Sequence, residues 1–559
     1  MAERIYHPCP QFCRDSWMDL SGSWDFAVSR EDAFPAEYDR VIQVPYCPES
    51  ALSGIGEHFP EGRFLFYRRK ITLPDAAAGK RVLLHVGAAD QVLSCYVNGV
   101  EIGTHVGGYT AFTMEITGAL GEENEILLRV QDDLRDEAFP KGKQSMEPGG
   151  MWYTPVSGIW QRVWLEWVPE TYIASLQISA DGTGAVLDTG DTRLSGTVTV
   201  QAPEGEQVLP LRNGKAEFFP ESPRLWSPED PYLYRFTICA GSDRVSGYFA
   251  LRFLSVKTAG GIPRLCLNEK PVFFHGLLDQ GYWPEGIYTP PELSCYEQEI
   301  RTLKRMGFNT LRKHIKVEPE EFYYQCDRLG MFVFQDMVSN GTYRFFHDTL
   351  LPTIGIQRED DRRAHRDPVI RELFRKNMEE EIRQLKNHPS IVLWTVFNEG
   401  WGQFCSDEMY RAAKELDSSR FVCTASGWFR GGESDVFSRH IYFGQWHQLK
   451  LTEKPLVLTE FGGIKLAVPG HLYRAGKSFG YQSSRNLQEY RRKLMGLYRS
   501  HILPAISRGL CAAIYTQVSD VEEEINGLLT YDRQVLKADE AEMAELSREL
   551  YRAMEEAVR

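Results

Sequence analysis

The sequence predicts a multidomain protein with two β-sandwiches followed by a (β/α)₈ barrel. Short β-like segments fill the chain up to about residue 170, and shorter strand-like segments continue to about residue 252. After about residue 260, strand-like and helix-like segments alternate. A length of 559 residues also suits several domains better than one. We therefore expect domains at residues 1–170, 171–255 and 256–559.

The first region is predicted to be a sandwich because its apolar runs are separated by Gly, Pro and Asn turns. No helical period of useful length interrupts them. Asn98 and Gly99 lie between two apolar runs and form a strong short-range hairpin signal. The strand lengths between residues 171 and 252 suit an immunoglobulin-sized sandwich.

The last 300 residues contain eight apolar segments that we expect to be the strands of the barrel. The segment 291–307 between two of them places Tyr296, Ile300 and Leu303 on one helical face and stops at Gly307, a residue suited to a left-handed cap. The eight strand-like segments lie at residues 271–280, 308–315, 331–337, 390–400, 421–427, 439–443, 455–463 and 511–520.

Composition excludes several classes of protein. Hydrophobic residues make up 43% and charged residues 25%, as in a globular protein with packed cores. The formal net charge of −14 opposes binding to nucleic acid or anionic lipid. The first residues resemble no signal peptide, and no stretch is apolar enough to span a bilayer. We expect a cytoplasmic location with no membrane partner.

The cysteines indicate neither a disulfide framework nor a metal centre. Eleven of them are scattered from Cys9 to Cys511, without the even, close spacing of secreted scaffolds. We expect reduced thiols in the core. No CxxC or HExxH motif is present, so we expect no structural zinc and no required cofactor.

Polar side chains follow the apolar segments at the ends that should form the mouth of the barrel. Catalytic groups of such barrels come from the carboxyl ends of the strands. A carboxylate after an apolar run is costly to bury unless it is paired or used. The polar residues at these ends are Asp279, Arg312, His314, Asp336, Asn398, Glu399, Ser426, His440, Tyr442, Glu460, Gln517 and Asp520.

Glu399 and Glu460, on the predicted fourth and seventh strands, suit the cleavage of a glycosidic bond. One carboxyl group would protonate the leaving oxygen while the other meets the positive charge that develops at the anomeric carbon. A separation of about 5 to 5.5 Å favours a covalent intermediate and retention, whereas about 6.5 to 9.5 Å favours inversion. Aromatic residues near the mouth would stack on sugar rings, and we expect this of Trp401, Trp428 and Tyr442.

The chain resembles glycoside hydrolase family 2 over nearly its whole length. The first region carries LSGSWDF at 20–26, FYRRKITLP at 66–74, VNGVEIGTHVGGYTAF at 97–112 and SGIWQRVWLE at 157–166, which look like the jelly-roll sugar-binding domain of that family. PRLWSPEDPYLY at 223–234 is similar to the end of its immunoglobulin-like domain. WTVFNEG at 394–400 and LTEFGG at 458–463 are similar to its acid/base and nucleophile motifs.

The resemblance implies a retaining exo-glycosidase with Glu460 as nucleophile and Glu399 as general acid/base. Asn398 would hydrogen-bond the sugar 2-hydroxyl. Arg312 matches the arginine of the strand-two motif of the family. In that motif a histidine follows three residues later, whereas His314 follows Arg312 by two residues. We expect the remaining substrate contacts to come from Asp279, His314, Trp401, Trp428, His440, Tyr442 and Gln517.

Two departures from the family shape the expected substrate. The segment after strand three has no acidic residues that align with a magnesium site, so we expect no metal. The Asn-x-Lys with which β-glucuronidases hold the sugar carboxylate is absent, because Glu524, Ile525 and Asn526 occupy the corresponding region. Acidic neighbours would repel a uronate, so we expect a neutral β-linked sugar with galactose as the first candidate.

Other functions stay open at this point. Within the family they are a β-glucuronidase, a β-mannosidase and an α-L-arabinofuranosidase. Outside it, an inactive carbohydrate-binding protein would retain sugar binding without hydrolysis. The β domains also leave a homo-oligomer open.

Overall fold

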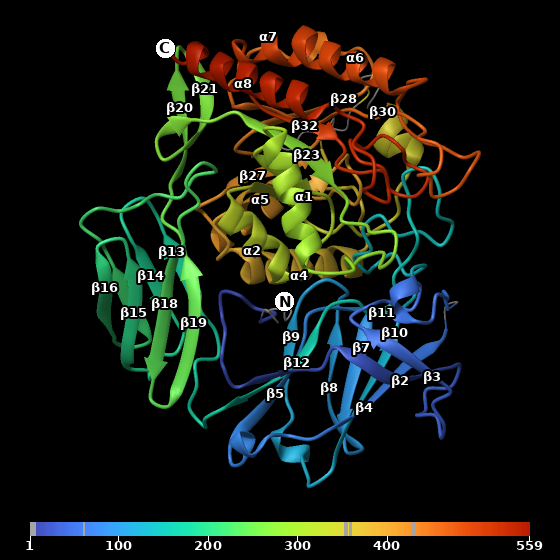
Figure 1. Cartoon of the computed structure of the whole chain (residues 1–559), viewed down its shortest axis with the longest axis vertical. Helices are drawn as coiled ribbons and strands as arrows, with labels where there is room; N and C mark the ends of the chain where they lie inside the picture. Colours follow the sequence, from blue (N-terminus) through green and yellow to red (C-terminus); the bar gives the residue numbers. More distant parts are fainter. Residues whose placement is uncertain (1–6, 60–61, 352–355, 357–359, 428–431) are drawn as a thin grey trace.

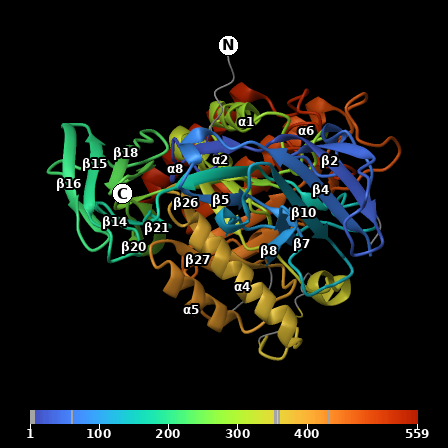
Figure 2. The ribbon, with the colours of Figure 1, turned by 90° about the horizontal axis from the view of Figure 1, so that it is seen from below.

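The computed structural model describes residues 7–59, 62–351, 356, 360–427 and 432–559. It arranges the sheets of residues 17–168, the sheets of residues 177–249 and a barrel as three neighbouring bodies (Figure 1 and Figure 2). This is the predicted fold class. The domain limits stay predictions: residue 170 falls between strands, whereas residue 255 falls inside β20 (Leu254–Ala259).

The first body is a sandwich of two sheets with strand orders β3-β2-β4-β10-β7-β8 and β1-β12-β5-β9. Its buried core includes Trp24, Leu84 and Leu165. The predicted hairpin turn is present, because Asn98 (φ 51°) and Gly99 (φ 78°) both take left-handed conformations between two paired strands. The strands are β1 (Trp17–Asp19), β2 (Gly22–Ser29), β3 (Arg40–Val44), β4 (Phe64–Ile71), β5 (Arg81–Val86), β6 (Ala89–Asp90), β7 (Val92–Val97), β8 (Val100–Val106), β9 (Phe112–Glu115), β10 (Asn124–Gln131), β11 (Gly158–Ile159) and β12 (Val163–Val168).

The second body is a smaller sandwich, drawn in green at the side of the molecule (Figure 1). Its sheets have the orders β13-β14-β17 and β16-β15-β18-β19. It contacts the barrel through Tyr248, whose hydroxyl donates to Asp327 at 2.7 Å. Its strands are β13 (Gln177–Ala180), β14 (Ala185–Asp188), β15 (Gly196–Ala202), β16 (Gly205–Leu211), β17 (Lys215–Phe218), β18 (Tyr234–Ala240) and β19 (Asp243–Phe249).

The third body is a barrel of eight parallel strands, each at a position that the sequence predicts. The order is β27-β26-β25-β24-β23-β32-β29-β28. Between the two outer strands of this order, Asp435 closes the ring, since its N–H donates to the Val422 carbonyl and its carboxylate accepts from the Val422 N–H, each at 2.9 Å. The strands are β23 (Phe274–Asp279), β24 (Thr310–Lys313), β25 (Phe332–Asp336), β26 (Ile391–Asn398), β27 (Phe421–Ser426), β28 (Phe437–Ile441), β29 (Leu456–Gly462) and β32 (Leu510–Thr516).

Helices cover the barrel, and the helix predicted at 291–307 is present. It buries the predicted face of Tyr296, Ile300 and Leu303. A last helix, which the sequence analysis did not predict, buries Met543, Leu546 and Leu550 against the barrel. The helices are α1 (Ser294–Arg305), α2 (Glu320–Leu329), α4 (Pro368–Leu385), α5 (Ser406–Leu416), α6 (Leu487–Leu497), α7 (Leu503–Ile506) and α8 (Glu540–Ala557).

Apolar side chains fill one end of the barrel and leave the other for polar groups. The hairpin of β20, β21 (Ile262–Leu267) and β22 (Lys270–Pro271) packs Leu265 and Leu267 into the same cluster as Phe274 and Phe332. At the opposite end, the short strands β30 (Ile464–Lys465) and β31 (Gln482–Ser483) lie beyond β29. The carboxyl ends of all eight strands therefore meet at one mouth.

The cysteines are free thiols, and six of them are buried. Cys239 is exposed, so the expectation of a core position is wrong for it. None of the described helices combines the length and the apolar character needed to cross a membrane.

Candidate active site

Arg312 at the end of β24 forms hydrogen bonds with side chains at the ends of four other barrel strands. Its guanidinium is fully buried and pairs with Asp336 at 2.9 Å. One terminal nitrogen donates to Glu460 Oε1 at 2.8 Å. The other donates to Asn398 Oδ1 at 2.9 Å and to Ser426 Oγ at 3.1 Å. A planar guanidinium with five N–H donors suits this role, because it fixes several acceptors at once.

Glu460 on β29 is held as an ionised carboxylate. Its side chain is only 6% exposed, and its second oxygen accepts a hydrogen bond from the Tyr442 hydroxyl. Burial is the largest influence and raises the pKa of Glu460. The charges of His440, Arg312 and His314, with the Tyr442 hydroxyl, outweigh it and lower that pKa to about 2.

Glu399 follows β26 and is the more accessible of the two glutamates. Its backbone has a left-handed conformation (φ 52°), and its N–H donates to the Ser426 carbonyl at 3.1 Å. Its side chain is 13% exposed and contacts Nδ1 of His440 at 2.8 Å. Oxygens of Glu399 and Glu460 lie within 4.8 Å of each other, with a nitrogen of His440 within the same distance of both.

His440 lies between the two glutamates. Its ring is fully buried, with Nδ1 facing Glu399 and Nε2 3.5 Å from Glu460 Oε1. These three residues offer enough ligand atoms for a metal ion, but Arg312 already occupies Glu460 Oε1 with a cation. A second cation at that oxygen would be repelled, so the donor set does not fit a metal.

The remaining predicted residues surround this centre. His314 contacts Asp336 at 2.8 Å. Asp279 is buried and pairs with Lys313 at 2.6 Å, which places it in an internal ion pair. Gln517, just after β32, donates to Asn526 at 3.0 Å.

Aromatic residues flank both glutamates. Tyr442 stacks on Tyr481, with ring centroids 3.7 Å apart. Trp401, two residues after Glu399, is buried and meets the ring of Trp152 edge-on at 5.2 Å. The predicted residue Trp428 lies outside the described residues.

Sequence analysis missed the residues that reach the mouth from the first sandwich. Trp152 lies against Trp401, and the Tyr153 hydroxyl donates to Glu524 beyond β32. Both belong to the long segment 132–157 between β10 and β11, where residues 132–148 carry no named strand or helix. A loop of this length within a compact domain is often functional, which is the signal that the sequence offered.

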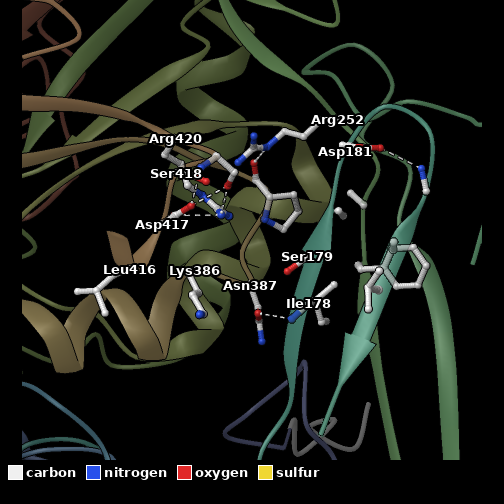
Figure 3. A pocket seen from close by; sticks show the side chains of 18 of the residues that line it. Ile178, Ser179, Asp181, Arg252, Lys386, Asn387, Leu416, Asp417, Ser418 and Arg420 are labelled. Atoms are coloured by element: carbon white, nitrogen blue, oxygen red, sulfur yellow. Dashed lines mark hydrogen bonds and ion pairs between the residues drawn. The ribbon is translucent and has the colours of Figure 1, made fainter. Parts of the chain in front are cut away.

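A cavity of about 400 Å³ lies elsewhere, between the second sandwich and the barrel (Figure 3). It is lined by Ile178, Asn387, Arg252 and Arg420, among others. Arg252 donates to the carbonyls of Pro389 and Ile391 at 2.6 and 2.7 Å. These contacts join the second sandwich to the barrel.

Two protein-family models match the chain. The family model described as "Glycosyl hydrolases family 2, TIM barrel domain" matches residues 263–550, and "Glycosyl hydrolases family 2" matches residues 171–252. The chain belongs to glycoside hydrolase family 2. The motifs around Glu399 and Glu460 lie within the matched barrel.

Within glycoside hydrolase family 2, the chain is similar to a β-glucuronidase of Felis catus, with 25% identity over 80% of this chain and 78% of the relative. It is also similar to a β-galactosidase of Thermoanaerobacter pseudethanolicus, with 24% identity over 70% and 52%. The chain spans about half the length of two of the curated relatives that it matches. The structure of a β-D-glucuronidase from Dictyoglomus thermophilum superposes with a TM-score of 0.73 at 19% identity, covering 96% of this chain and 98% of that one.

Proposed function

We propose that this chain is a retaining exo-glycosidase that releases a terminal β-linked sugar. The separation of the catalytic oxygens carries the proposal. One oxygen of Glu399 and one of Glu460 lie within 4.8 Å, which is nearer to the roughly 5 to 5.5 Å of retaining enzymes than to the roughly 6.5 to 9.5 Å of inverting ones.

Glu460 acts as the nucleophile. With its pKa lowered to about 2, it stays ionised at neutral pH, and Arg312 and Tyr442 fix its two oxygens. Attack forms a bond from Glu460 to the anomeric carbon and breaks the bond to the leaving oxygen. In the second step Glu460 is the leaving group and regains its negative charge, which the Arg312 guanidinium stabilises.

Glu399 acts as the general acid and then as the general base. It gives its proton to the leaving oxygen, and later takes a proton from the water that cleaves the glycosyl-enzyme. Its higher exposure suits a group that meets both leaving group and water. Across the part of the chain that the structure describes, the Nδ2 amide of Asn398 has no hydrogen-bond partner, which leaves it for the sugar 2-hydroxyl.

We propose a terminal uronic acid as the sugar, because relatives named as β-glucuronidases support a uronide better than the galactoside first expected from sequence. The acidic residues of the loop after β32, which were expected to repel a uronate, contact other residues of the protein. Asp520 pairs with Lys537 at 2.6 Å, and Glu524 contacts Tyr153 and Asn526. Burial raises the pKa of Glu524, which lessens its repulsion of an anionic sugar.

A screen of nitrophenyl glycosides tests the proposal. The purified protein should hydrolyse the β-glucuronide or β-galacturonide in preference to the β-galactoside, β-glucoside, β-mannoside and α-L-arabinofuranoside, and Glu460→Ala should remove that activity. Preference for a neutral glycoside would overturn the choice of sugar. Binding of a sugar without hydrolysis of any glycoside would instead support an inactive carbohydrate-binding protein.

A further inference from the structure

The segment 132–157 of the first sandwich is docked on the mouth of the barrel at both ends. At one end, the N–H groups of Lys141 and Gly142 donate to the Ser339 carbonyl at 3.1 and 3.4 Å. A Cβ on Gly142 would lie 2.7 Å from the Ile315 carbonyl oxygen, so the backbone passes tightly beside the residue that follows His314.

The other end of this segment reaches the loop after β32. The Tyr153 hydroxyl donates to Glu524, and the Thr154 N–H donates to Glu522 at 2.9 Å. The Tyr153 N–H in turn donates to the Lys143 carbonyl at 3.0 Å. The backbone of Lys143 is therefore fixed between the ends of β24 and β32.

The ammonium group of Lys143 lies at the mouth, and no described carboxylate pairs with it. Its ammonium nitrogen lies 5.2 Å from the centroid of the Trp152 ring, which itself meets Trp401 beside the acid/base Glu399. Among the described residues, no carboxylate lies within ion-pairing distance of it. The cations at the strand ends differ, because each has an acid: Arg312 with Asp336, Lys313 with Asp279, Lys316 with Glu318 and Lys537 with Asp520.

The charge of Lys143 acts on both walls of the mouth. Burial lowers the pKa of His314, and the Lys143 ammonium lowers it further. Burial raises the pKa of Glu524, and the same ammonium opposes that rise. These two effects agree with the placement of the Lys143 ammonium over the Trp152 ring, between the segment ends that contact β24 and β32.

We propose that Lys143 binds the carboxylate of a terminal uronic acid, a role that rests on the proposed function. An ammonium group offers three N–H donors and a full charge to a carboxylate. The substrate carboxylate would form the ion pair with Lys143 that no described carboxylate of the protein forms. Specificity for the acid would then come from the first sandwich, whereas the barrel supplies the catalytic carboxylates.

The test compares Lys143→Met with the wild type on a nitrophenyl β-uronide and on a neutral nitrophenyl β-glycoside. Removing the cation that pairs with the substrate carboxylate should lower kcat/KM on the uronide about 50-fold, mainly through KM. The neutral glycoside should change less than about 3-fold, since it has no charge to lose. Lys143→Arg should recover part of the activity on the uronide. Lys477→Met is the matched control, since Lys477 is an exposed cation of the mouth loops that pairs only loosely with Glu523, at 3.7 Å.

Three results would count against these assignments, and they separate the two proposals. If the wild type cleaves uronides and Lys143→Met cleaves them equally well, the role of Lys143 is wrong while the proposed function stands. An equal loss on charged and neutral substrates would also overturn the role, because it would indicate a structural effect. If the wild type cleaves only neutral glycosides, the proposed sugar fails and Lys143 loses its partner.

Discussion

The two sides of the mouth treat their glutamates differently. On the seventh strand, Glu460 is 6% exposed and has donors on both oxygens. On the fourth strand, Glu399 is 13% exposed and its side chain contacts Nδ1 of His440. In the proposed mechanism, the same side chain therefore serves as a fixed anion on one side and as a proton carrier on the other. The surroundings, rather than the residue type, set the role.

The largest effect should come from removing the fixed anion. Glu460→Ala should lower kcat on the best aryl glycoside on the order of 10⁴-fold, because it removes the carboxylate that would form the glycosyl-enzyme. The measurement is steady-state kinetics, with Glu453→Gln as control. Glu453 is an exposed residue before the start of β29, far from the mouth, and should leave kcat unchanged. Equal activity of Glu460→Ala and the control would contradict the assignment.

Removing the proton carrier should depend on the leaving group. Glu399→Ala should lose about 10²- to 10⁴-fold on a glycoside with a poor leaving group, and much less in the first step on a dinitrophenyl glycoside. Added azide should accelerate turnover of the activated substrate and yield a glycosyl azide of retained configuration. A loss that is independent of the leaving group would show that Glu399 has another role.

The smallest of these effects should come from the histidine that connects the two sides. Its charge lowers the pKa of Glu460, so His440→Asn should raise that pKa while keeping an amide near Glu399. Only ionised Glu460 can attack, so a higher pKa moves the acid limb of the kcat/KM profile to higher pH. We expect a loss of about 10-fold on the acid side of the profile and a smaller loss near neutral pH, where Glu460 stays ionised in both proteins. An unshifted acid limb would contradict the coupling.

Local patterns were sufficient to predict most of the fold. The eight barrel strands are long apolar runs, and the turn at Asn98 and Gly99 needs only its own two residues. Glu399 and Glu460 could be chosen because each ends such a run. The helix α8 is not among the predicted elements, although its buried residues Met543, Leu546 and Leu550 recur at helical spacing.

The rest of the mouth depends on how distant segments dock. Trp152 and Tyr153 reach the site only because the segment 132–157 crosses from the first sandwich onto the barrel. Nothing near them in the sequence specifies that contact. The fully buried place of His440 between two glutamates is likewise a result of strand packing, since the sequence alone predicts only its position at a strand end.

The stereochemistry of the first-formed product tests the central claim most directly. Proton NMR of the anomeric region should be recorded during the first minutes of hydrolysis of the best aryl β-glycoside. A double displacement on Glu460 predicts that the β-anomer is released first and then equilibrates to the α-anomer. Release of the α-anomer first would mean single displacement by water, and would contradict a covalent glycosyl-enzyme on Glu460.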